Sequence, residues 1–138
     1  MVEEARAALI LVVDEIHETR EGIERLLKAD GYSVALSKDE PDAIQSVRRT
    51  RPDLILVSLA GSSSEVLASA RRIREEPEAE EIPIVFWVED IDEGEEVAMG
   101  ENVYLLRPDN FNQLRGLLAR VLDREIMAVH IANEVAAD

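Results

Sequence analysis

Two kinds of polar side chain follow apolar runs in this sequence, and both could take part in chemistry. Asp14 and Glu15 come directly after the apolar residues 8–13, and Ser58 ends a second run over residues 53–58. Carboxylate oxygens are among the ligands that Mg²⁺ prefers, whereas a serine hydroxyl attacks an electrophile only with help from a general base. The residue types therefore indicate a cation site or, if a carboxylate lies beside Ser58, an activated hydroxyl.

The elements that position these residues follow from the hydrophobic pattern. Both runs are short, continuous and bounded by turn or helix-ending residues, which is typical of strands buried on both faces of a parallel sheet. In such sheets the site lies beyond the carboxyl ends of the strands. We therefore expect Ser58 at the end of the central strand, on the same edge as Asp14.

The remaining pattern alternates helices with strands. Further strands are predicted over 32–36, 82–88 and 103–106, and helices over 18–28, 39–50, 64–75 and from about 109 to 122. The acidic stretch 89–99 predicts a short or frayed helix, and the acidic cluster 75–81 predicts a solvated loop. This alternation gives right-handed βαβ units, and so the predicted fold is an α/β doubly wound, five-stranded parallel sheet with helices on both faces.

Composition limits the classes of function. The length of 138 residues predicts one domain over residues 1–123, with 124–138 as a helical extension or tail. There are no cysteines, which excludes disulfides and thiolate metal sites. The formal net charge of -15 disfavours nucleic acid and anionic membrane as partners. With no apolar run of membrane-spanning length, we expect a cytoplasmic protein.

Five segments in order resemble the receiver domains of two-component response regulators, over roughly residues 9–122. They are residues 11–15, 31–34, 52–56, 82–85 and 104–108. The resemblance implies a flavodoxin-like or CheY-like sheet with the strand order 2-1-3-4-5. It also implies that Asp14 and Glu15 are the acidic pair of the pocket and that Tyr104 is at the position of the switch aromatic.

The chain departs from the family's pattern at three positions. The phosphoacceptor Asp falls on Ser58, the switch Thr or Ser on Val88, and the Lys on Arg107. A hydroxyl is a poorer nucleophile than the family's carboxylate, and Val88 cannot donate a hydrogen bond to a phosphoryl oxygen. The guanidinium of Arg107 suits a bidentate pair with Asp14. We expect that pair to occupy the pocket, with Mg²⁺ binding weak or absent and no other cofactor.

The leading hypothesis is therefore a pseudo-receiver, which is not an enzyme and acts by protein–protein contact without phosphorylation. Its expected partner is a sensor kinase, effector or other signalling protein, bound at the face of the fourth helix, fifth strand and last helix; homodimer formation is left open. One alternative is a receiver that still accepts a phosphoryl group on Asp14, Glu15 or Ser58. Another is a small-molecule sensor that uses the vacated pocket.

Overall fold

The computed structural model describes residues 7–90, 102–106 and 111–122, apart from the side chains of 59–67, 88–90 and 105. The chain forms two compact units, residues 1–107 and residues 108–138. The first unit holds the sheet and the candidate site. In the second unit residues 111–122 are helical, with Leu114, Leu118 and Leu122 buried at a spacing of four residues.

The first unit contains a five-stranded parallel sheet with the order β2-β1-β3-β4-β5. The strands are β1 (Leu9–Val13), β2 (Ser33–Ser37), β3 (Leu54–Ser62), β4 (Ile84–Asp90) and β5 (Val103–Leu106). The predicted fold class and strand order are confirmed. The chain reverses its direction of winding between β1 and β3, and this switch point is where parallel sheets form their sites.

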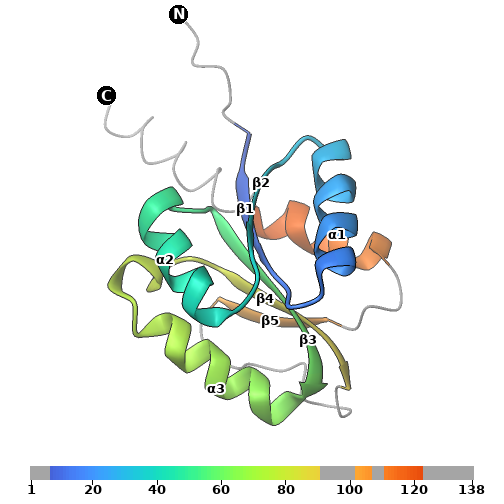
Figure 1. Cartoon of the computed structure of the whole chain (residues 1–138). Helices are drawn as coiled ribbons and strands as arrows, with labels where there is room; N and C mark the ends of the chain where they lie inside the picture. The colour runs from blue at the N-terminus through green and yellow to red at the C-terminus, as the bar shows by residue number, and fades with distance from the viewer. Residues whose placement is uncertain (1–6, 91–101, 107–110, 123–138) are drawn as a thin grey trace, which may run out of the picture. The chain divides into compact units, whose positions relative to one another are not determined.

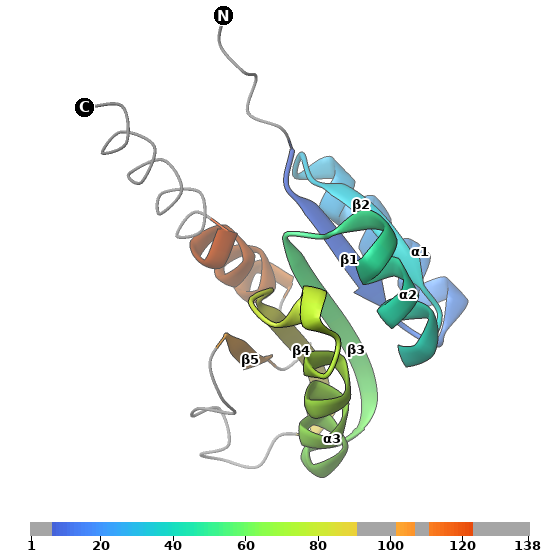
Figure 2. The same ribbon diagram turned by 90° about the vertical axis from the view of Figure 1, so that its left-hand side faces the viewer.

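Helices cover both faces of the sheet. The helical elements are α1 (His17–Ala29), α2 (Glu40–Thr50), α3 (Ser63–Arg74) and the short 3₁₀ helix η1 (Pro77–Ala79). In Figure 1, α1 lies on one face, and α2 and α3 lie on the other. Figure 2, seen from the side of α2 and α3, shows these two helices in front and α1 behind.

Local sequence explains where the helices begin and end. The Asp39 side chain accepts a hydrogen bond from the backbone N–H of Asp42 at 2.9 Å, which caps the start of α2. Arg51 ends α2 in the left-handed region, at φ 49°. After α1 the chain turns at Gly31, whose φ of 95° suits glycine because a side chain there would be strained.

The apolar runs of the central strands form the core. Leu11, Ile55 and Phe86, on three neighbouring strands, are all 0% exposed. They belong to one cluster with Ala43 and Val47 of α2, which are four residues apart and so share one helix face. Burying a large aliphatic side chain contributes about 1.5–3 kcal/mol, so this layer stabilises the strands that carry the site.

Two predictions about where strands end were wrong. β3 continues past Ser58 to Ser62, with an irregular register between Leu59 and Ser62, because Ser62 still pairs with Asp90 of β4. β4 therefore includes Glu89 and Asp90, where the acidic helix was expected to begin. The rest of that predicted helix, and the predicted extension over 124–138, lie outside the described residues.

The acidic cluster 75–81 is not simply a solvated loop. It contains η1, and Glu76 is only 7% exposed. The Glu76 carboxylate accepts a hydrogen bond from Arg48 Nε at 2.8 Å and lies 2.7 Å from Arg48 Nη2. Because these residues are 28 positions apart, α2 is tied to the segment that follows α3.

Candidate functional site

Asp14 is held rigidly at the carboxyl end of β1. It is 3% exposed, and its backbone N–H donates to the carbonyl of Ser37 at 3.1 Å. Its side-chain Oδ1 accepts from the backbone N–H of Ile16 at 2.9 Å, and its carbonyl accepts from Arg20 at 2.7 Å. The second carboxylate oxygen, Oδ2, is buried and has no hydrogen-bond partner among the described residues. This buried carboxylate thus keeps one oxygen that no described group hydrogen-bonds.

Ser58 lies beside Asp14 on the adjacent strand. The register pairs Val13 of β1 with Val57 of β3, so the next residue of each strand falls at the same edge. Ser58 is half-buried and is not the last residue of its strand. Since Asp14 Oδ2 has no described partner, the Ser58 hydroxyl does not donate to that oxygen. The general base that a serine nucleophile needs is not in place on the Asp14 side.

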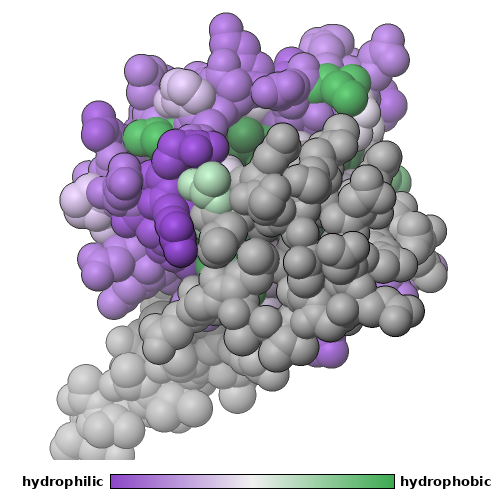
Figure 3. Space-filling model, turned by 90° about the horizontal axis from the view of Figure 1, so that it is seen from below, coloured by the Kyte–Doolittle hydropathy of each residue, from purple (hydrophilic) through white to green (hydrophobic). Residues whose placement is uncertain are grey.

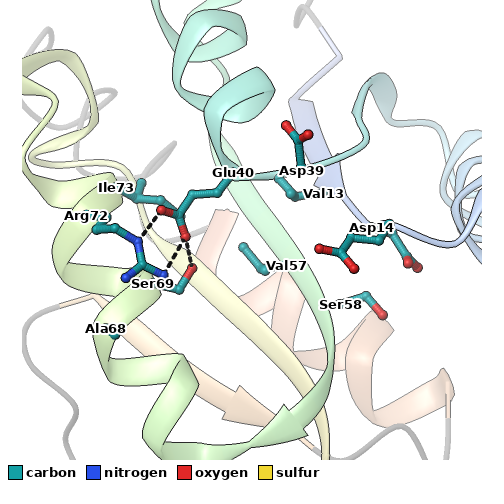
Figure 4. A pocket seen from close by; sticks show the side chains of 11 residues that line it. Val13, Asp14, Asp39, Glu40, Val57, Ser58, Ala68, Ser69, Arg72 and Ile73 are labelled. Carbon is teal, nitrogen blue, oxygen red and sulfur yellow. Dashed lines mark hydrogen bonds and ion pairs between the residues drawn. The ribbon is translucent and has the colours of Figure 1, made fainter.

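A pocket of about 410 Å³ opens beside these two residues. Figure 4 shows the Asp14 carboxylate turned toward the middle of the pocket, with Glu40, Ser69 and Arg72 on the opposite wall. The described lining residues are Val13, Asp14, Glu15, Asp39, Glu40, Val57, Ser58, Ala68, Ser69, Arg72 and Ile73. The volume is within the range of about 300–1,000 Å³ that is typical of small-molecule sites.

The opposite wall is a hydrogen-bonded cluster that sequence reasoning missed. Glu40, at the first turn of α2, accepts from the hydroxyl of Ser69 at 3.0 Å and from Arg72 Nη2 at 3.1 Å, and also from Arg72 Nε. The hydrogen bond and the negative charge of Glu40 raise the pKa of the Arg72 guanidinium above its ordinary value. Glu40 and Arg72 are 32 residues apart, so no local sequence motif predicts that they pair.

The other predicted site residues are placed less completely. Glu15 is exposed and lines the pocket, and Tyr104 is half-buried on β5. Val88 is on β4 with its backbone opposite Leu59, but its side chain is outside the described part. Arg107 also lies outside the described residues. The expected ion pair between Arg107 and Asp14 therefore stays a prediction.

The pocket offers few ligands for a divalent metal among the described residues. In the described part of the chain, no group of three or more His, Asp or Glu side chains is arranged to hold a metal ion. The nearest set is one buried carboxylate, one exposed carboxylate and a serine hydroxyl. Mg²⁺ is usually held by one or two carboxylates, with water completing its octahedron, so Asp14 and Glu15 are the residues that would hold it. No chemical step is assigned to a metal.

The described wall of the pocket carries more carboxylates than basic groups. Among the described lining residues there are four carboxylates, on Asp14, Glu15, Asp39 and Glu40, against the single guanidinium of Arg72. The guanidinium is already paired with Glu40. Seen from below, toward the carboxyl ends of the strands, the described surface is mainly hydrophilic (Figure 3). Among the described lining residues, carboxylates therefore outnumber basic groups by four to one.

A family model and the relatives of similar sequence indicate the same family. The family model described as "Response regulator receiver domain" matches residues 10–119. The response regulator MprA of Mycobacterium leprae is 30% identical over 118 residues, which are 83% of this chain and 51% of MprA. The response regulator PleD of Caulobacter vibrioides is 32% identical over 79 residues, which are 57% of this chain and 17% of PleD. The chain thus spans about half of the first relative and less of the second.

Solved structures agree on the fold. A chemotaxis protein CheY4 from Vibrio cholerae superimposes with a TM-score of 0.69 at 22% identity, covering 83% of this chain and 98% of that one. The receiver domain of the sensor histidine kinase PA1611 from Pseudomonas aeruginosa was solved with a magnesium ion in its active-site cleft. It superimposes with a TM-score of 0.67 at 26% identity, covering 85% of this chain and 98% of that one. Within the described ranges, no helix has both the length and the apolar character needed to cross a membrane.

Proposed function

This chain belongs to the response regulator receiver domain family of two-component signalling, and from that premise we propose that it is a pseudo-receiver. It signals through protein–protein contacts and does not depend on phosphorylation. The observation that carries the proposal is the side-by-side position of Ser58 and Asp14 at the carboxyl edge of the sheet. A hydroxyl thus stands where the resemblance expects the attacking carboxylate, next to a carboxylate that does not accept its proton.

Charge supports the same conclusion. Phosphoryl transfer depends on cations that offset the charge of the transferring group. The described pocket has an excess of carboxylates, and its only guanidinium among the described lining residues is engaged by Glu40. We propose that Arg107 adds a guanidinium that pairs with Asp14 instead of serving a phosphoryl group, and that Val88 offers no hydrogen bond to one.

The partner is proposed to be another signalling protein, such as a sensor kinase or an effector. The family resemblance implies docking on a face that includes β5. Tyr104 on β5 contributes to that face as a half-buried aromatic residue. The net charge of -15 supports the exclusion of nucleic acid as a partner. In this proposal the domain catalyses no reaction of its own and acts in the cytoplasm.

The test is a phosphorylation assay with acetyl phosphate and Mg²⁺, read by intact-mass spectrometry. We expect no adduct on the wild-type chain. A Ser58→Asp variant is the matched control, since it returns a carboxylate to the acceptor position and shows whether the conditions support transfer. A stoichiometric phosphoryl adduct on the wild type would overturn the proposal. Its stability would then identify the acceptor, because acyl phosphates of Asp14 or Glu15 are labile to hydroxylamine and phosphoserine at Ser58 is not.

A further inference from the structure

We propose that β2 is a self-association surface, where a second copy of this chain adds its own β2 antiparallel across a two-fold axis at Ala35. In the described sheet β2 is the first strand of the order β2-β1-β3-β4-β5, so it pairs with β1 on one side and has an open edge on the other. An open edge can pair with a strand of another chain, and one continuous sheet then runs through both copies.

The first observation is the direction of the backbone groups of β2. The N–H of Ser33, its first residue, donates to the carbonyl of Ala8 at 2.9 Å. The carbonyl of Ser37, its last residue, accepts from the N–H of Asp14 at 3.1 Å. The backbone groups of a paired strand alternate in direction from one residue to the next. The first, third and fifth residues of β2 therefore face β1, and the second and fourth face the open edge.

The outward residues, Val34 and Leu36, determine the register of a second strand. In an antiparallel ladder, the two residues of a hydrogen-bonded pair exchange both of their N–H···O bonds. A two-fold axis at Ala35 puts Val34 of each copy opposite Leu36 of the other. Both outward N–H groups and both outward carbonyls of each copy then have a partner, which they lack in the described part of a single chain.

The sequence of β2 is symmetric about the same residue. The strand reads Ser-Val-Ala-Leu-Ser, so this register pairs serine with serine, valine with leucine, and alanine with alanine. An interface between two identical copies has to be complementary to itself, and this strand meets that requirement. Val34 and Leu36 are half-buried in the single chain, so pairing removes more of their apolar surface from water.

Charge favours a second copy in the antiparallel direction. The formal net charge of -15 makes most contacts between two copies repulsive, but β2 contains no charged residue. It also has no proline and no irregularity of register, which are features that keep strand edges from pairing. Asp30 precedes the strand and Lys38 follows it. Antiparallel pairing brings the Lys38 end of each copy to the Asp30 end of the other, whereas parallel pairing would bring like charges together.

The inference is independent of the proposed function. β2 and β5 are opposite edges of the described sheet, so a copy bound at β2 does not occupy the docking face that includes β5. Strand pairing also needs no particular residue at position 58. A phosphoryl adduct would therefore overturn the pseudo-receiver and leave the β2 interface standing, and a monomeric chain would do the reverse.

Disulfide trapping tests the position of the axis, because the chain has no cysteine of its own. With the axis at Ala35, the two copies of this residue form a non-hydrogen-bonded pair with Cα atoms about 4.5 Å apart. A disulfide spans Cα distances of about 4.4–6.8 Å. The Ala35→Cys chain in a glutathione redox buffer should therefore form a covalent dimer, measured by non-reducing electrophoresis and intact-mass spectrometry.

Ser33→Cys is the matched control for trapping. Its position is more exposed than that of Ala35, so random collisions would cross-link it more readily. In the proposed register the two copies of residue 33 are four residues apart along the ladder, or more than about 13 Å, which is too far for a disulfide. We expect several-fold less covalent dimer from this variant than from Ala35→Cys.

Sedimentation velocity over a concentration series measures the self-association directly. Leu36→Pro removes an outward N–H and no hydrogen bond to β1, and it should weaken dimer formation by about tenfold or more. Lys38→Glu should weaken it as well, and adding Asp30→Lys should restore it because the two opposite charges are exchanged. Arg71→Glu makes the same change of charge at an exposed residue of α3 and should have a smaller effect than Lys38→Glu.

Four results would overturn the inference. One is a wild-type chain that stays monomeric up to millimolar concentration, and another is equal trapping of Ala35→Cys and Ser33→Cys. A third is self-association that Leu36→Pro leaves unchanged, which would place the contact elsewhere. The fourth is an equal loss in Lys38→Glu and Arg71→Glu, which would mean that only net charge matters. If Leu36→Pro unfolds, as judged by circular dichroism, the trapping ratio and the charge exchange decide.

Discussion

A single change of residue type, at Ser58, alters what its neighbour Asp14 can do. With a carboxylate at both positions, two negative groups on adjacent strands would share one cation. With a hydroxyl at position 58, Asp14 keeps a buried oxygen that has no described partner. The chemical character of the site therefore follows from the pair of residues and not from either one alone.

Returning the second carboxylate should create a metal site. We expect Ser58→Asp to lower the thermal unfolding midpoint in EDTA, because the new charge lies beside buried Asp14. Added Mg²⁺ should restore the midpoint and raise it further, since a ligand that binds only the folded state stabilises it. The Mg²⁺ affinity should increase by about tenfold or more, or ~1.4 kcal/mol. Ser58→Asn is the uncharged control; an equal Mg²⁺ response in it would contradict the prediction.

Glu76 should make stability depend on pH. The hydrogen bond from Arg48 lowers the pKa of this carboxyl below its ordinary 4.5, although its burial acts in the opposite direction. The folded state therefore binds the proton less readily than the unfolded state. The stabilisation is present above about pH 4.5 and is lost as the pH falls through the lower, folded-state pKa.

The test compares urea unfolding of Glu76→Gln with wild type at neutral and acidic pH. The variant should be less stable near neutrality, and the difference should shrink as the pH falls below about 4.5. Glu81→Gln, at an exposed position of the same segment, should follow the wild type. A difference that stays constant with pH would show that the lost stability is not linked to ionisation of Glu76.

At the scale of elements, the cap of α2 also holds one side of the pocket. Asp39→Ala should destabilise the domain by about 1 kcal/mol, because it removes the acceptor for the Asp42 N–H. Asp39→Asn should cost much less, since it keeps an acceptor at the same place. Chemical denaturation of the two variants measures the difference. Equal losses would mean that the charge of Asp39 matters more than the cap.

The central strand should be the element least tolerant of truncation. Leu56 of β3 is 0% exposed and is flanked by β1 and β4. Leu56→Ala should cost about 2–5 kcal/mol, through lost burial and the cavity left behind. Leu26→Ala on α1, where the side chain is 47% exposed, should cost far less. A similar urea midpoint for the two variants would contradict the central role of β3.

The sequence predicted best the strands whose boundaries are set by neighbouring residues. β1, β2 and β5 begin and end within one residue of their predicted bounds, because hydrophobic pattern and flanking turns define them. β3 and β4 were predicted too short at their carboxyl ends, since Ser62 and Asp90 pair as polar residues beyond the apolar runs. Backbone pairing needs no apolar side chain, so a hydrophobic pattern does not reveal such an extension.

The candidate site was predictable to the same extent. Asp14 and Ser58 were expected at one edge, because each follows a predicted central strand, and the structure brings them together. The wall formed by Glu40, Ser69 and Arg72 was missed, since it joins two helices through contacts about 30 residues apart. Only the packing of α2 against α3 determines that these side chains meet.

At the scale of the whole molecule, the net charge of -15 should make the fold sensitive to salt. Raising the ionic strength from about 0.01 M to about 0.15 M shortens the screening length from ~30 Å to ~8 Å. We expect the thermal unfolding midpoint to rise, because repulsion among the carboxylates is relieved. The exposed ion pairs that salt weakens contribute only about 0–1 kcal/mol each. A midpoint that falls with added NaCl would show that those pairs outweigh the repulsion.

The pairing of β3 with β4 gives the molecule an optical probe of its own. Trp87, the only tryptophan of the chain, sits directly across the ladder from Ser58. Indole emission responds to the polarity and charge of its surroundings, so events at the acceptor position can be followed in unlabelled protein by fluorescence. A change in Trp87 emission would report that a ligand or modification occupies the site. The same change on addition of a protein partner would show that partner binding is coupled to the site.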